Sequence, residues 1–183
     1  MNKRLIRILS TLTAAAALTA LVSCGSAVYA REALPLAAGI CIDRARIAFH
    51  NGNVSEAVDI LAEFRDRGNG KTAETIRRKG YDHSYVHFLF GSYSLTLSQD
   101  SEGLEARRRL KRAMEGFERA VQAEPGFSEA WLNLAKCRYE SGDHSRAADA
   151  FRRGYETSET PKPNLLYYAA VCRFRSDDPQ GAL

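Results

Sequence analysis

One stretch near the middle of the chain constrains the fold more than any other. Its first half carries apolar residues at spacings of three and four, at Trp131, Leu134 and Ala135. Residues at these spacings share one face of a helix. Gly142-Asp143 marks the end of that helix, because glycine is favoured at the position that follows a helix C-terminus. A second apolar stripe then begins at Ala147, Ala150 and Phe151. The stretch therefore predicts two helices joined by a tight turn.

This helical hairpin resembles the tetratricopeptide repeat (TPR). In this family, residues of a given size or type recur at fixed positions of each repeat. The first helix has a large residue, here Trp131, and a leucine followed by a small residue, here Leu134-Ala135. Gly-Asp at the turn is Gly142-Asp143, and the alanine, aromatic and small residue of the second helix are Ala147, Phe151 and Gly154. A single hairpin of this size cannot bury its own apolar stripe, so neighbouring hairpins must stack. The resemblance implies an all-α solenoid in which the hairpins form a right-handed superhelix.

The pattern recurs along the chain and predicts a TPR domain over residues 36–183. The repeats span about 36–67, 84–126, 127–161 and 162–183, the last of them incomplete. The first repeat departs from the pattern, since Cys41 and Arg44 stand where a large residue and a leucine are expected. The second repeat has about ten extra residues, which predict a polar turn at 98–101 and a long second helix over about 102–123.

Two further expectations concern the joints of this domain. Residues 71–79 are predicted to form a short helix or structured linker, and the helix that follows is expected to be capped by Asp82 or Ser84. The fourth repeat stops at Leu183, where its second helix would begin. A half-repeat leaves an apolar edge open. We therefore expect either that the chain is the N-terminal part of a longer protein or that a partner covers this edge.

Residues 1–23 have the features of an export signal. Lys3, Arg4 and Arg7 form a positive start, and residues 8–22 are an apolar segment too short for a transmembrane helix. Residues 21–24, Leu-Val-Ser-Cys, resemble the bacterial lipobox. The resemblance implies cleavage before Cys24 and acylation of that residue with palmitate-type chains, with residues 24–35 as a tether. Because Gly25 follows, the lipoprotein sorting rule leaves the protein free to reach the outer membrane and face the periplasm.

Two alternatives to lipidation stay open. Residues 28–30, Val-Tyr-Ala, form an acceptable signal peptidase I site, which would give a soluble periplasmic protein. An uncleaved segment would instead act as an anchor. All three interpretations place the chain in the bacterial cell envelope.

The TPR resemblance also implies where a partner binds, because ligands of this family contact fixed positions on the first helix of each repeat. Nine residues at those positions form what we call the predicted wall: Tyr85, Phe88, Glu129, Leu132, Lys136, Tyr139, Tyr167, Phe174 and Arg175. Aromatic anchors beside a few charges suit an extended peptide or a partner helix. The competing interpretation, kept open for Tyr139 and Phe174, is that these rings pack against the next helix.

No pattern in the sequence indicates catalysis or a cofactor. His83 and His87 have a spacing that can hold a metal, but no third ligand is evident, so no metal site is predicted. Cys137 and Cys172 occupy the same repeat position and are expected to be small core residues beyond disulfide reach. The basic run 107–112 is expected to be a solvated helix face, and a net charge of +4 does not argue for nucleic acid.

These observations predict a non-enzymatic interaction scaffold, tethered to a membrane through a lipid anchor, that binds a protein or peptide partner in envelope assembly or secretion. Two alternatives belong to other classes. The first is a transporter-accessory or solute-binding TPR lipoprotein, which an enclosed pocket lined by Tyr85, Phe88 and Tyr167 would favour. The second is the docking module of a longer enzyme.

Overall fold

A computed structural model describes residues 33–176 of the chain, and every element in that range is helical. The prediction of an all-α fold is therefore confirmed for these residues. The chain divides after Ala33, and the unit that begins at Leu34 contains the eight described helices. They are α2 (Leu36–His50), α3 (Val54–Asp66), α4 (Ala73–Lys79), α5 (Ser84–Gln99), α6 (Gly103–Ala123), α7 (Ser128–Glu140), α8 (His144–Glu156) and α9 (Asn164–Arg175).

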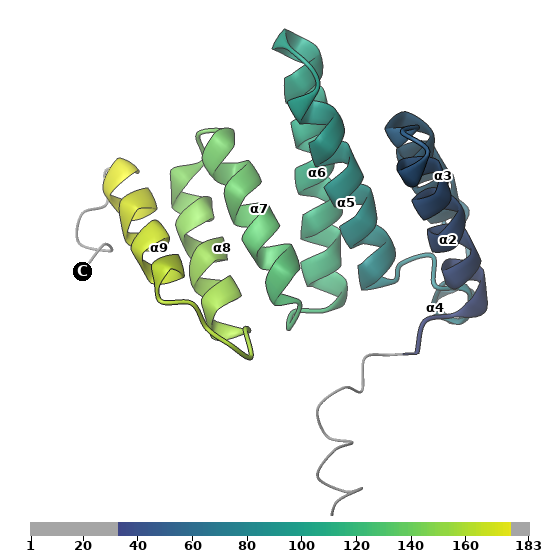
Figure 1. Cartoon of the computed structure of the whole chain (residues 1–183). Helices are drawn as coiled ribbons and strands as arrows, with labels where there is room; N and C mark the ends of the chain where they lie inside the picture. Colours follow the sequence, from purple (N-terminus) through teal and green to yellow (C-terminus); the bar gives the residue numbers. More distant parts are fainter. Residues whose placement is uncertain (1–32, 177–183) are drawn as a thin grey trace, which may run out of the picture. The chain divides into compact units, whose positions relative to one another are not determined.

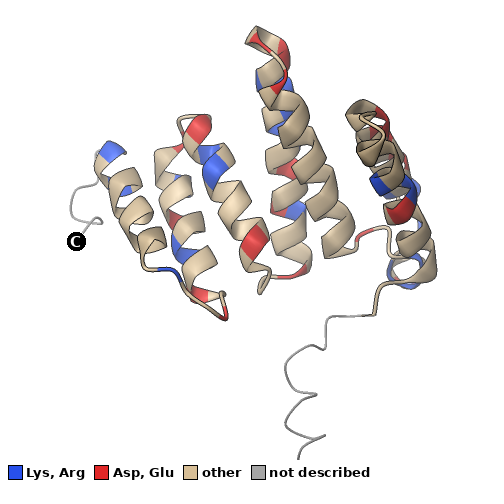
Figure 2. Cartoon of the chain, viewed as in Figure 1, with Lys and Arg blue, Asp and Glu red and all other residues tan. Residues whose placement is uncertain are grey.

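Seven of these helices follow one another in a row (Figure 1). The main contacts join α2 to α3, α3 to α5, α5 to α6, α6 to α7, α7 to α8 and α8 to α9. Three hairpins, α2–α3, α5–α6 and α7–α8, are thus complete, and α9 is the first helix of a fourth. Acidic and basic residues are spread along the row (Figure 2). This arrangement is the stacking of hairpins that the sequence predicts.

The turns within the first and third hairpins have the same geometry. Gly52 and Gly142 have φ values of 83° and 85°, in the left-handed region that favours glycine. The next amide in each turn donates back into the first helix: Asn53 N to Ala48 O and Asp143 N to Arg138 O, both at 2.9 Å. These bonds satisfy carbonyls that a helix end would otherwise leave free.

Three apolar clusters form the core along the row. Their buried members include Leu61 between α2, α3 and α5, Phe117 between α6 and α7, and Phe151 between α7, α8 and α9. The second helix of each hairpin begins its apolar stripe with an alanine that is completely buried: Ala57, Ala113 and Ala147. Each cluster is thus built by adjacent helices, so no hairpin is covered without its neighbour.

The α5–α6 hairpin is longer than the others, and its two helices come closest to each other at two glycines, Gly91 and Gly116. A Cβ built on Gly116 would lie 2.7 Å from both N and Cα of Gly91, and one built on Gly91 would lie 2.9 Å from the Phe117 ring. Such distances are shorter than van der Waals contact. The two helix backbones approach this closely because neither residue has a side chain.

One detail of this hairpin differs from the sequence-based expectations. The polar turn predicted at 98–101 is shorter than expected, because α5 continues through Gln99. Ser98 Oγ donates to Leu95 O at 2.9 Å, which keeps this serine compatible with the last helical turn. The second helix, α6, begins at Gly103, and Arg109 ties it back to α5 by donating to Leu97 O and Ser101 Oγ.

The joint before α5 also differs in one respect. Residues 73–79 form the short helix α4, as predicted, and Gly80 ends it with φ 74°. The cap of α5, however, is neither Asp82 nor Ser84. His83 occupies that position, and its Nδ1 accepts the backbone N–H of Tyr85 at 3.2 Å. The Asp82 carboxylate is engaged instead by His87, at 2.6 Å from its Nε2.

Candidate partner-binding site

The predicted wall lies on α5, α7 and α9, which are the first helices of their hairpins. Five of its residues are exposed: Glu129, Lys136, Tyr167, Phe174 and Arg175. The other four are half-buried: Tyr85, Phe88, Leu132 and Tyr139. The wall therefore combines residues that are held by packing with residues that are free to meet a partner.

At the α5 end, the two aromatic residues of the wall are anchored in the structure. Phe88 packs between Phe117 and Phe127, with ring centroids 5.8 and 4.8 Å away. The Tyr85 ring lies 6.1 Å from Phe88, and its hydroxyl accepts a 2.8 Å hydrogen bond from Arg46 Nη2. Phe88 thus serves mainly the core, whereas Tyr85 and Arg46 form a polar, solvent-facing edge of it.

Arg46 is a member of this surface that the sequence did not single out. It lies on α2, in the first hairpin, and its guanidinium also stands 5.7 Å from the centroid of the Tyr85 ring. The pattern of the first repeat is degenerate, so it predicts no wall residues there. Aligning the turn glycines Gly52 and Gly142 places Arg46 level with Lys136 and would have identified it.

Three wall residues of α7 differ in their roles: Glu129, Leu132 and Lys136. Leu132 packs against the backbone of α8, since a Cβ on Gly154 would lie 2.7 Å from Leu132 Cδ2. Glu129 is exposed in the first turn and accepts a 3.2 Å hydrogen bond from Ser128 Oγ. Lys136 is exposed one turn after Leu132. Glu129 and Lys136 thus lie on either side of Leu132, whose apolar side chain packs α7 against α8.

At the far end, α7 and α9 bring an aromatic ring and a cation together. The Arg175 guanidinium lies 5.2 Å from the centroid of the Tyr139 ring, and His144 packs on the same ring at 5.2 Å. Phe174 is 71% exposed and Tyr167 is 66% exposed. Tyr139 therefore packs within the array, as the competing interpretation held for it, whereas the Phe174 ring presents most of its surface to solvent.

Three of the histidines and cysteines considered in the sequence are buried in the structure: His87, Cys137 and Cys172. Within residues 33–176, no group of three or more His, Cys, Asp or Glu residues is placed to hold a metal. His87 is completely buried; burial disfavours its charged form more than Asp82 favours it and lowers the pKa of the imidazole to about 4. Cys137 and Cys172 are buried free thiols, and burial raises the pKa of both.

Ion pairs link the hairpins to one another and involve residues behind the wall. Arg65 of α3 is almost buried, donates to Glu115 of α6 at 3.0 Å and stands 4.1 Å over the Phe90 ring. Arg138 of α7 contacts Glu118 of α6 at 2.9 Å. Burial lowers the pKa of Arg65, and the bond to Glu115 opposes this effect. The i,i+4 pairs Glu105–Arg109 and Glu115–Arg119 within α6 are also present, at 2.9 and 3.8 Å.

The basic run on α6 is largely solvent-facing, as expected. Arg107, Arg108, Lys111 and Arg112 are exposed, and Arg109 is held by its contacts to α5. Among the helices described between residues 33 and 176, none has both the length and the apolar character needed to cross a bilayer. Cys24 and the rest of the leader lie outside the described residues.

The fold defines a helical-hairpin repeat protein whose first helices carry an aromatic and charged surface. Comparison with known proteins agrees. A family profile described as "Tetratricopeptide repeat" matches residues 104–154, from the first turn of α6 into α8. The "TPR repeat-containing protein PA0015" of Pseudomonas aeruginosa is 31% identical over 87 residues, which cover 48% of this chain and 73% of that protein. The chain belongs to the tetratricopeptide-repeat family.

Solved structures show the same fold. The crystal structure of MamA matches 78% of this chain and 70% of its own length, with a TM-score of 0.52 and 12% identity. The Sgt2 TPR domain from Aspergillus fumigatus matches 83% of this chain and 87% of its own length, with a TM-score of 0.54 and 14% identity. At these identities the likeness establishes the TPR-like fold and nothing about a ligand.

Proposed function

We propose that this chain is a non-enzymatic scaffold that binds a protein or peptide partner through the predicted wall. As a member of the TPR family it carries a domain of the kind that mediates protein–protein interaction. The observation that carries the proposal is the exposure of Tyr167 and Phe174 on α9, the helix whose Arg175 lies 5.2 Å from the Tyr139 ring. Tyrosine and arginine are among the residues that most often dominate binding energy at interfaces.

The exposure of Tyr167 also favours a scaffold over a solute-binding protein. The second interpretation requires Tyr85, Phe88 and Tyr167 to line an enclosed pocket. Phe88 is packed among the core rings of α6 and the α6–α7 turn, whereas Tyr167 is 66% exposed on α9. A lining residue of an enclosed pocket presents much less surface, so an open surface for an extended partner fits better.

The proposal includes the location of the protein. The lipobox-like sequence ending at Cys24 supports a lipid anchor on the periplasmic side of a bacterial membrane, and Gly25 supports the outer membrane. Several acyl chains hold a protein on a bilayer where a single chain does not. In that place a scaffold of this kind would serve envelope assembly or secretion.

The location is tested by the intact mass and membrane partitioning of the protein beside Cys24→Ala in a Gram-negative host. We expect the wild type to carry acyl mass and sediment with membranes, and the variant to lose both properties. If both proteins are soluble and begin near Arg31, the anchor is wrong and a diffusible periplasmic protein takes its place.

The binding surface is tested separately by site-specific photo-crosslinking. A photoreactive amino acid replaces Phe174 or Tyr167 on the wall, and Arg107 or Arg152 on the second helices as matched exposed controls. We expect the same adduct from both wall positions and none from the controls. Adducts that form equally from all four positions would mean that the wall is not the site.

A further inference from the structure

The outer side of α2 is the most unusual surface of the array, because the same side is buried in every other first helix. In α7 this side consists of Ala130, Leu134 and Cys137, which pack on the preceding helix α6. The corresponding residues are Val86, Phe90 and Tyr93 in α5, and Leu165, Ala169 and Cys172 in α9. Each of these sets packs against the helix before it, α3 or α8.

In α2 the corresponding residues are Ile40, Arg44 and Ile47, and all three face solvent. Ile40 is 55% exposed and Ile47 is 61% exposed, with Leu36 completing the apolar stripe one turn before Ile40. We call these four residues the edge face. The repeat geometry thus builds a surface for a preceding helix, and residues 33–176 contain no helix that covers it.

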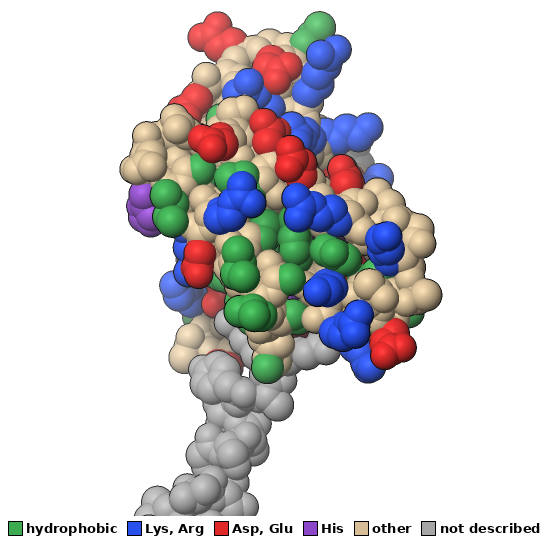
Figure 3. All heavy atoms as spheres, turned by 90° about the vertical axis from the view of Figure 1, so that its right-hand side faces the viewer, with side chains coloured by type: hydrophobic (Ala, Val, Ile, Leu, Met, Phe, Trp, Pro, Cys, Tyr) green, Lys and Arg blue, Asp and Glu red, His purple; other side chains and the backbone are tan. Residues whose placement is uncertain are grey.

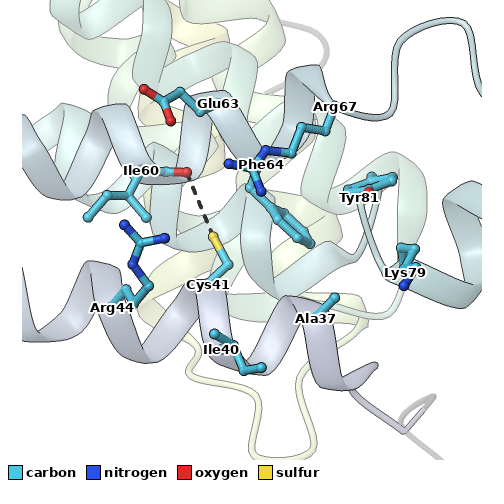
Figure 4. A pocket seen from close by; sticks show the side chains of 10 residues that line it. All are labelled: Ala37, Ile40, Cys41, Arg44, Ile60, Glu63, Phe64, Arg67, Lys79 and Tyr81. Atoms are coloured by element: carbon cyan, nitrogen blue, oxygen red, sulfur yellow. Dashed lines mark hydrogen bonds between the residues drawn. The ribbon is translucent and has the colours of Figure 1, made fainter.

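The edge face is hollowed between α2 and α3. A cavity of about 310 Å³ opens beside Ile40, with Cys41 and Phe64 among its lining residues, and Cys41 Sγ donates to Ile60 O at 3.7 Å (Figure 4). A flat surface does not fill a hollow of this kind, but a side chain projecting from a helix does. Figure 3 shows apolar side chains at this end of the row with Lys and Arg close to them, and Asp and Glu along the upper border of the same face.

The charge around the hollow is predominantly positive. Arg44, Arg67 and Lys79 line it, Arg78 borders the neighbouring hollow beside Leu36, and Glu63 is the one acidic residue that lines either of them. Arg44 stands at the centre of the edge face, between the two isoleucines. The repeat pattern has a leucine at this position, so the substitution changes what the face can bind from a purely apolar helix to one that offers a carboxylate.

We propose that the edge face binds an acidic amphipathic helix of a partner protein, which extends the row by one helix on the N-terminal side of α2. An apolar side chain of that helix fills the hollow beside Ile40, and a carboxylate meets Arg44. The interaction follows from the way α6 packs on α7, where Ala113, Phe117 and Ala120 cover the corresponding face. The site is separate from the predicted wall and does not depend on the anchor.

Charge disfavours the two occupants that the chain itself could supply. A second copy joined through the same face would bring Arg44, Arg67 and Lys79 against their own equivalents, and like charges in an interface are costly. Residues 24–32, which stay on the protein after the proposed cleavage, contain only Arg31 and Glu32 as charged residues, so they offer no net negative charge. An acidic partner meets neither difficulty, and complementary charge speeds its association.

The test uses two peptides that share one apolar face and differ only in charge. Both have the sequence 102–123, which is α6 with its cap. The acidic peptide carries Arg107→Glu, Arg108→Glu, Lys111→Glu and Arg112→Glu, all at positions exposed in α6; the basic peptide carries lysine at all four positions. Binding of each labelled peptide to the full chain, purified as its host produces it in mild detergent, is followed by fluorescence anisotropy.

We expect saturable binding of the acidic peptide, at least about tenfold tighter than that of the basic peptide. Ile40→Asp should abolish binding. Arg44→Glu should weaken the acidic peptide about tenfold and strengthen the basic one, a reversal that misfolding cannot produce. Leu104→Asp, at an apolar residue that is 73% exposed on α6, is the matched control and should bind like the wild type.

Three results would overturn the proposal. The first is no saturable binding of the acidic peptide, and the second is binding that Arg44→Glu leaves unchanged. The third is sedimentation with anionic phosphatidylglycerol vesicles that depends on Ile40 and Arg44 in a protein that binds neither peptide. That outcome would assign the edge face to the membrane surface. Far-ultraviolet circular dichroism of each variant establishes that it is folded before binding is compared.

Discussion

The contact between Gly91 and Gly116 makes the sharpest prediction about stability. In Gly116→Ala the new Cβ would stand 2.7 Å from the α5 backbone, about 1 Å inside ordinary carbon–carbon contact. The obstacle is backbone, so α5 and α6 must separate and loosen the packing of Phe90 and Phe117. Overpacking of this kind costs about 1–3 kcal/mol, while the better helix propensity of alanine returns up to about 1 kcal/mol. We expect the free energy of unfolding to fall by about 1–2 kcal/mol in total.

Gly39→Ala provides the matched control, because the same substitution is made inside another helix. The nearest atom to its Cβ would be Leu34 Cδ2, at 3.8 Å, which is ordinary contact. Only the better helix propensity of alanine then remains, and we expect the free energy of unfolding to rise by about 0.5–1 kcal/mol. Gly154→Ala should fall between the two, because the 2.7 Å neighbour there is the end of the flexible Leu132 side chain.

Urea unfolding of the three variants measures these effects. Far-ultraviolet circular dichroism reports on all helices, and the fluorescence of Trp131, the single tryptophan, reports on the α6–α7 turn, where its Nε1 donates to Pro125 O at 2.8 Å. We expect the midpoint to fall for Gly116→Ala and to rise for Gly39→Ala at similar slopes. The reasoning is refuted if Gly116→Ala unfolds at the same urea concentration as the wild type or a higher one.

Three more predictions concern buried titratable groups. Stability should fall by up to about 3 kcal/mol as the pH drops from about 6.5 to about 4, because unfolded histidine takes up a proton in that window and buried His87 does not. His87→Leu should flatten this part of a urea-midpoint profile measured against pH. The Cys137 thiol, with its pKa raised to about 12, should react with a thiol reagent only after urea unfolding; labelling of the folded protein at this residue, located by mass spectrometry, would contradict its burial. Glu115→Gln should lower the urea midpoint by the equivalent of about 1–3 kcal/mol, since it leaves the Arg65 charge without its carboxylate, and an unchanged midpoint would count against this pair.

The sequence predicts the fold well where each residue has one packing role. Trp131, Leu134 and Ala135 specify the third hairpin because their sizes and spacing fit a single arrangement of helices. The turn glycines specify where the hairpins close, since a positive φ leaves few alternatives. These local requirements repeat along the chain, and their agreement from one repeat to the next identifies the TPR family.

Other features depend on contacts between hairpins and were not predictable in this way. The hydrogen bond from Arg46 to Tyr85 joins residues 39 positions apart, and no local pattern signals it. The exposure of Ile40 and Ile47 is likewise invisible in the sequence, because isoleucine at these positions has the spacing of a core residue. The polarity of Ser98 predicts a turn, whereas its hydroxyl bonds to Leu95 O within α5 and lets the helix continue. The partner-binding role of the wall stays a prediction.

The contacts of each helix with its immediate neighbours have a consequence for how the molecule responds to force or to a ligand. A strain applied at α9 reaches the first hairpin mainly through the α8–α9, α7–α8, α6–α7 and α5–α6 junctions, and each junction can yield on its own. The row of helices therefore deforms one junction at a time, and a partner that binds one hairpin stiffens that hairpin first. Hydrogen exchange along the row would display this grading, with the slowest amides in the doubly flanked α5–α6 and α7–α8 hairpins.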